Sequence, residues 1–192
     1  MNVLEHLEPK SVFRFFEEMC AIPHGSRNTK AVSDWCADFA RARGLEYHQD
    51  GDNNIIIIKE AAPGYEAAPP VILQGHLDMV CEQTADCQKD MSREGLDLAV
   101  DGDFVYAKGT TLGGDDGIAV AMALALLDAE GLPHPRLEAV FTVDEEIGLL
   151  GAASIDVTPL KGRQMLNLDS EAEGIFTVSC AGGNTSACLL PL

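Results

Sequence analysis

Imidazole and carboxylate side chains, the groups that bind divalent metal ions in proteins, occur in four short clusters along this sequence. In chain order the clusters hold His76 and Asp78; Asp115 and Asp116; Asp144, Glu145 and Glu146; and Asp169 and Glu171. Three clusters directly follow a short apolar run, and the second lies in the glycine-rich stretch 113–117, just before a long apolar segment. One histidine with several carboxylates is a ligand set that suits zinc or manganese.

The elements that must position these clusters can be predicted from the pattern of apolar residues. Apolar runs predict strands over 55–58, 71–73, 137–143, 165–168 and 175–180, and a hairpin over 96–105. Amphipathic spacing predicts helices over 11–20 and 30–43, with Ser11 as the N-cap of the first and Gly44 ending the second. The almost entirely apolar segment 116–129 predicts a buried helix.

Alternation of strands and helices predicts an α/β fold, with a mostly parallel mixed sheet and helices on both faces. In such sheets the ligand crevice lies beyond the carboxyl ends of the strands, which is where three of the clusters fall. So many carboxylates at one edge would repel each other and raise their pKa values. Two divalent cations would remove that repulsion, because two Zn²⁺ balance three ligand carboxylates and one hydroxide.

Each cluster also has a purely structural explanation when it is taken alone. A histidine can be hydrogen-bonded in a core, and acidic residues can cap a helix, favour its first turn or form a turn. His76 could be the core histidine, and Asp115 or Asp116 could be the helix cap. Glu145 and Glu146 could be first-turn acids, and Asp169 could form a turn. They do not explain why all the clusters follow strand ends or open a helix.

Composition limits the function further. The 192 residues carry a formal net charge of −18, which disfavours general nucleic-acid binding and favours cations. The longest apolar run, Ile118 to Leu127, is shorter than the ~20 residues of a membrane span, and residues 1–6 lack the features of a secretory signal. We therefore expect a cytoplasmic protein with no membrane partner. The six cysteines show no C-x-x-C spacing, which is typical of reduced thiols in a core.

Several stretches together resemble the co-catalytic zinc exopeptidases related to aminoacylase and glutamate carboxypeptidase. These stretches are GHLDMV at 75–80, GTTLGGDDG at 109–117, TVDEEIG at 142–148 and LDSE at 168–171. Within that group the sequence is most similar to the aminoacyl-histidine dipeptidase (peptidase D) subgroup, which AIPHGS at 21–26 also resembles. The similarity runs from about residue 12 to the last residue.

The resemblance implies hydrolysis of small dipeptides by a water molecule activated at two divalent metal ions, with zinc favoured over manganese or cobalt. It implies that Asp115 bridges the two ions and is followed by a cis peptide bond. The other implied ligands are His76 and Asp169 for one ion and Glu146 for the second. Asp78 would orient His76, and Glu145 would be the general base.

The sequence departs from this family at one ligand. The family takes a further histidine from near the C-terminus, and the only later histidine here, His134, lies between two prolines in a predicted loop. We therefore expect residues 1–192 to be the N-terminal segment of a catalytic domain, without the lid or dimerisation domain and the C-terminal catalytic segment. One metal site would then be incomplete and the segment inactive alone, while the full-length protein would be a homodimer.

Other functions remain open at this point. A deacylase or carboxypeptidase of the same superfamily would share the metal chemistry and differ in substrate. A non-catalytic metal- or peptide-binding module would keep the fold but would not need Glu145 as a base. An acidic interaction domain would bind no metal at all.

Overall fold

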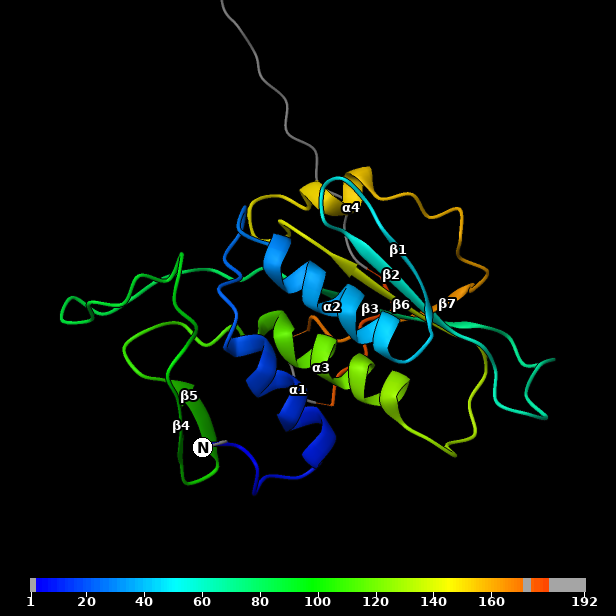
Figure 1. Cartoon of the computed structure of the whole chain (residues 1–192), viewed down its shortest axis with the longest axis horizontal. Helices are drawn as coiled ribbons and strands as arrows, with labels where there is room; N and C mark the ends of the chain where they lie inside the picture. Colours follow the sequence, from blue (N-terminus) through cyan, green and yellow to red (C-terminus); the bar gives the residue numbers. More distant parts are fainter. Residues whose placement is uncertain (1–2, 171–173, 180–192) are drawn as a thin grey trace, which may run out of the picture.

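A five-stranded sheet forms the centre of the fold (Figure 1), with the strand order β1-β2-β6-β3-β7. The computed structural model describes residues 3–170 and 174–179. The strands are β1 (Glu46–Gln49), β2 (Ile55–Lys59), β3 (Val71–His76), β6 (Leu137–Thr142) and β7 (Gln164–Asn167). β3 runs parallel to both β6 and β7, whereas β2 is antiparallel to β1 and to β6. The α/β class is confirmed, but two of these four pairings are antiparallel, so the sheet is less parallel than the sequence predicts.

The three long helices, α1 (Lys10–Cys20), α2 (Lys30–Ala42) and α3 (Gly114–Asp128), share one apolar core with one face of the sheet. Alternate residues of a strand point to opposite faces, and Ile55 and Ile57 of β2 enter this core. Ile56 and Ile58 point to the other face, where they pack with Ile155 and Leu160. Both faces of β2 are thus buried, which explains its unbroken run of isoleucines.

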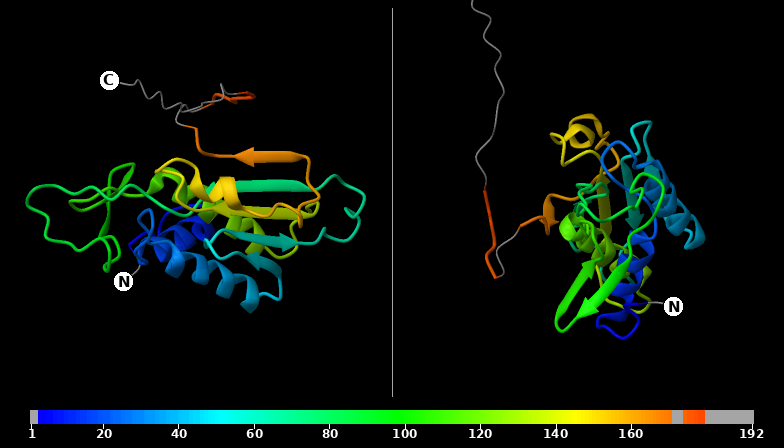
Figure 2. Two further views of the ribbon diagram at one scale, coloured as in Figure 1. Left: turned by 90° about the horizontal axis from the view of Figure 1, so that it is seen from above. Right: turned by 90° about the vertical axis from the view of Figure 1, so that its left-hand side faces the viewer.

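Helical cover differs between the two faces of the sheet. On the second face the only described helix near the sheet is the short α4 (Leu150–Ser154), which precedes Ile155 (Figure 1). Helices therefore lie on both faces as predicted, but the second face has only this one short helix among the described residues. A separate hairpin of β4 (Leu98–Asp101) and β5 (Phe104–Ala107) stands beside the sheet (Figure 2).

Some local predictions are wrong. α1 begins at Lys10 with Pro9 as its N-cap, so Ser11 lies inside the helix and caps nothing. Residues 175–179 form no strand, and residue 180, where that strand was predicted to end, lies outside the described part of the chain. β1 and α4 were not predicted. None of the helices in the described residues is long and apolar enough to cross a bilayer.

Candidate metal centre

Four segments that are far apart in sequence bring the predicted ligands to one edge of the sheet. β3 and β6 end side by side, with His76 in register with Thr142, so residues after both strands emerge at the same edge. His76 ends β3, Glu145 and Glu146 follow β6, and Asp169 follows the end of β7. Asp115 lies at the start of α3, which packs against β3.

The possible ligand atoms form two groups that share Asp115. In each group, one ligand atom from each residue lies within 4.8 Å of the others: His76, Asp115 and Glu146 in the first, and Asp115, Asp116 and Asp169 in the second. Asp115 is thus placed where a bridging carboxylate would be needed. The groups divide the ligands differently from the division that the resemblance implies, because Asp169 is grouped with Asp116 and His76 with Glu146.

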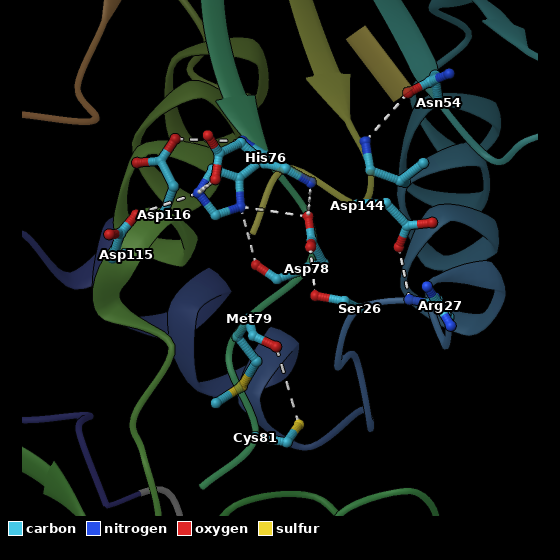
Figure 3. A network of polar contacts seen from close by, with 12 residues as sticks. Ser26, Arg27, Asn54, His76, Asp78, Met79, Cys81, Asp115, Asp116 and Asp144 are labelled. Atoms are coloured by element: carbon cyan, nitrogen blue, oxygen red, sulfur yellow. Dashed lines mark hydrogen bonds and ion pairs between the residues drawn. The ribbon is translucent and has the colours of Figure 1, made fainter. Parts of the chain in front are cut away.

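His76 is oriented by a short chain of contacts (Figure 3). Its Nδ1 lies 2.9 Å from the backbone oxygen of Asp78 and 3.4 Å from that residue's Oδ1. A carbonyl oxygen can only accept, so Nδ1 donates and Nε2 is turned toward the acidic cluster. Nε2 lies 3.1 Å from Asp115 Oδ1 and 3.9 Å from Glu145 Oε2. Once Nε2 loses its proton, the ring presents its lone pair where a cation would be shared with Asp115.

The carboxylate of Asp78 is buried and has donors on both oxygens. Oδ1 accepts the backbone N–H of Glu145 at 3.0 Å, and Oδ2 accepts the hydroxyl of Ser26 at 2.8 Å. Burial alone would raise the pKa of Asp78, but the hydrogen bonds from His76, Glu145 and Ser26 outweigh it and lower that pKa. Asp78 is therefore ionised and connects His76 to the segment that carries Glu145.

The sequence places Asp116 in the second cluster but gives it no role in the site. Its side chain is buried, and Oδ2 accepts the backbone N–H of His76 at 3.2 Å. A side chain at Gly75 would meet this same oxygen at 2.9 Å, so glycine is needed there for the close approach. The peptide bond Asp115–Asp116 is cis, as the resemblance implies. In the sequence, the only sign of this role was that Asp116 directly follows Asp115 in the glycine-rich stretch 113–117.

Burial and mutual repulsion shift the pKa values of the residues in this cluster. Burial raises the pKa of Asp116 to about 7, with the charges of Asp169 and Asp115 adding to it. Burial and the neighbouring Asp115 raise the pKa of Asp169 to about 6, and the pKa of Glu146 is raised for the same two reasons. Burial lowers the pKa of His76, but the Asp78 hydrogen bond and the charges of Asp116, Asp78 and Asp169 raise it to about 9. A divalent cation would relieve this repulsion, so the donor set fits a metal.

His134, rejected as a ligand from the sequence, lies away from the cluster. His134 is buried just before β6, at the opposite end of that strand from His76, and its Nδ1 donates to the backbone oxygen of Pro135 at 2.7 Å. It lines a hollow of about 730 Å³ together with Lys59 and Tyr65, away from the acidic cluster. Glu171 lies outside the described residues.

Comparison with known proteins shows the family. Residues 72–183, which include all the ligand candidates, match Peptidase family M20/M25/M40. The chain belongs to this peptidase family. It is 38% identical over 183 residues to the cytosol non-specific dipeptidase of Escherichia coli, which covers 95% of this chain and 38% of that protein.

Solved structures agree with the assignment of the fold. The aminoacylhistidine dipeptidase of Vibrio alginolyticus superposes with a TM-score of 0.86 and 38% identity, over 89% of this chain and 35% of the other. A tripeptidase of Staphylococcus aureus, with 22% identity and a TM-score of 0.70, covers 85% of this chain and 44% of its own and is similar in fold. This peptidase-family chain thus spans little more than a third of the length of its dipeptidase relatives.

Proposed function

We propose that the chain forms part of the catalytic domain of a metal-dependent dipeptidase. The observation that carries the proposal is that His76, Asp115 and Glu146, from three separate segments, present ligand atoms within 4.8 Å of one another. The names of the E. coli and Vibrio relatives, a non-specific dipeptidase and an aminoacylhistidine dipeptidase, support small dipeptides as substrates. The word cytosol in the first name also supports a cytosolic location.

The proposed ligands are His76, Asp115, Glu146 and Asp169, with Asp115 shared between two divalent ions. Zinc suits this mixture of imidazole and carboxylate, and manganese or cobalt are the alternatives. Bound ions would lower the pKa of water toward 7 and polarise the scissile carbonyl.

Glu145 is proposed as the general base. Its Oε2 lies 3.9 Å from His76 Nε2, at the edge of the ligand cluster, while its backbone N–H is held by Asp78. Its side chain is about one-quarter exposed, so it can reach both the cluster and an incoming substrate. In this position the carboxylate can take a proton from the attacking water and deliver it to the leaving amine. Asp78 acts through His76 and Glu145 and is a positioning residue.

We further propose that residues 1–192 are an N-terminal segment of a longer catalytic domain. β7 lies at the edge of the sheet, and Met165 and Leu166 remain more than half exposed, as does Leu168 beyond it. Among residues 3–170 and 174–179 no strand pairs with the outer edge of β7, and exposed apolar side chains beside such an edge are typical of a surface that further chain covers. The rest of the protein would then contain the lid or dimerisation domain and the C-terminal catalytic segment, which would supply the missing histidine ligand. The full-length protein would be a homodimer. The net charge of −18 argues against nucleic acid as a partner.

Zinc titration of the 192-residue chain by calorimetry tests the metal site. With one ligand of the second ion missing, we expect at most one tight site, and two equally tight sites would contradict the expectation that one site is incomplete. The chain alone should hydrolyse no aminoacyl-histidine dipeptide; measurable turnover would show that the missing segments are not needed.

The role of Glu145 is tested in the longer protein. Glu145→Gln should abolish dipeptide hydrolysis while zinc content by elemental analysis stays unchanged, because the amide has the same shape but cannot take a proton. Loss of zinc together with activity would make Glu145 a ligand instead of a base. Assay of N-acyl amino acids beside dipeptides separates a dipeptidase from a deacylase of the same superfamily.

A further inference from the structure

The connection between α1 and α2, residues 21–29, is packed against the metal centre although it contributes no ligand to either group. Its backbone joins the segment that follows β3: Met79 N–H donates to the oxygen of His24 at 3.2 Å, and Ser26 N–H donates to the oxygen of Met79 at 3.3 Å. Gly25 and Met79 form a parallel bridge. A side chain at position 25 would meet the sulfur of the exposed Cys81, which would have to turn away.

Two adjacent residues of this connection contact the two acidic segments of the site (Figure 3). The Ser26 hydroxyl donates to Asp78 Oδ2 at 2.8 Å. The Arg27 backbone N–H donates to Asp144 Oδ1 at 2.6 Å, and Asp144 directly precedes Glu145. Arg27 and Asp144 both have positive φ values, 66° and 55°, a conformation that is uncommon for residues other than glycine. These contacts therefore join the α1–α2 connection to both the His76 side and the Glu145 side of the centre.

We infer that Ser26 is a positioning residue of the metal centre, through its hydroxyl. A carboxylate with free rotation about its last bond would not hold two donors in fixed directions. The Ser26 hydroxyl occupies Oδ2 of Asp78, which leaves Oδ1 directed at the backbone N–H of Glu145 and at His76 Nδ1. Ser26 thus sets the direction of the carboxylate that fixes both the imidazole and the base-bearing segment.

This inference rests on the proposed metal site and has a chemical consequence for it. Without the hydroxyl, Asp78 can turn or take a water at Oδ2, and His76 Nε2 is then held less firmly toward Asp115. Groups that orient a metal ligand typically affect metal affinity by 10–100-fold when they are removed. Ser26 acts one contact farther out, so we expect a loss of about tenfold in zinc affinity, at the lower end of that range.

The test compares three variants of the 192-residue chain. Ser26→Ala removes the hydroxyl, and Ser26→Thr retains it. Ser33→Ala is the matched control, because the buried Ser33 hydroxyl accepts a hydrogen bond from Gln49 at 2.8 Å and contacts no member of the metal centre. Zinc affinity is measured by competition with a chromophoric chelator. Ser26→Ala should lose about tenfold, while Ser26→Thr and Ser33→Ala should stay within about twofold of the unsubstituted chain.

A second readout needs no metal. The Glu145 amide donates to Asp78 Oδ1, so its hydrogen exchange should become faster in Ser26→Ala, while exchange of the β2 amides should not change. Uniformly faster exchange in both regions would mean a general loss of stability and would overturn the positioning role. Unchanged zinc affinity and Glu145 exchange in Ser26→Ala would overturn it as well. If the unsubstituted chain binds no zinc, the proposed function fails, and the inference fails with it.

Discussion

Zinc binding should displace protons from the site, and the number of protons follows from the pKa values of its residues. His76 has a pKa of about 9 in the metal-free chain, so it carries its extra proton at pH 7 and must lose it before Nε2 can bind a cation. Asp169, with a pKa of about 6, is about one-tenth protonated at that pH. Zinc bound between His76 and Asp115 should therefore release about one proton, with a fraction more where Asp169 or Asp116 also ionises.

Zinc affinity should increase with pH. Because binding releases about one proton, zinc affinity should rise about tenfold between pH 7 and pH 8. At pH 9, close to the pKa of His76, the release should fall to about half a proton, since half of the rings are already neutral.

Calorimetry in buffers with different ionisation enthalpies measures this release, because the slope of observed heat against buffer enthalpy is the number of protons. His76→Gln removes a proposed ligand, so it should weaken zinc binding strongly, and any binding that remains should release about one proton fewer at pH 7. The control is His48→Gln, a substitution at an exposed histidine paired with Glu46 on β1. A slope near zero at pH 7, or one that does not change with pH, would refute the arrangement of His76 among the carboxylates.

Two further predictions concern the scaffold. Ile57 is fully buried between β2 and the helices, so Ile57→Ala should lower the free energy of unfolding by about 2–5 kcal/mol, measured by urea denaturation; a change below 1 kcal/mol would contradict the placement of the core. The buried Glu138 accepts hydrogen bonds from the Arg136 side chain at 2.7 Å and from the Gly162 backbone at 2.9 Å, and Arg136 has a second, exposed partner in Glu60. Glu138→Gln should therefore cost about 1.5–3 kcal/mol at pH 7, the range for a lost hydrogen bond to a charged group. Burial would raise the pKa of Glu138, but these donors lower the pKa below its ordinary value of 4.5. The stability that the carboxylate contributes is therefore present above pH 4.5 and is lost as the pH falls through the lowered pKa. The unfolding free energies of the unsubstituted and Glu138→Gln proteins should converge in acid, and a difference that does not change with pH would count against this ion pair.

The sequence was most informative where a residue's environment is determined locally. Four consecutive isoleucines predict a buried strand, and Gly44, with a positive φ of 65°, follows the end of α2 as its residue type indicates. β1 could not be predicted, because Glu46–Gln49 is polar and mostly exposed and is held in the sheet by backbone pairing with β2. Strand directions were also hidden, since an apolar run does not show which way its neighbours run.

In the site too, features set by local sequence were predictable and features set by packing between distant segments were not. Its location was predictable because the carboxyl ends of β3 and β6 coincide, which places their following residues together. The burial of Asp116 and the contact from Ser26 to Asp78 depend on how α3 and the α1–α2 connection pack against β3. Such contacts between distant segments leave no periodic signal in the sequence. The strand predicted over 175–180 is wrong over its described residues because apolar composition alone cannot supply a neighbouring strand.

Anomalous diffraction at the zinc edge, from crystals grown with zinc, tests the central claim most directly. We expect a zinc peak about 2.0–2.2 Å from His76 Nε2 and from a carboxylate oxygen of Asp115. A well-ordered chain whose zinc lies elsewhere, with no ion between His76 and Asp115, would contradict it.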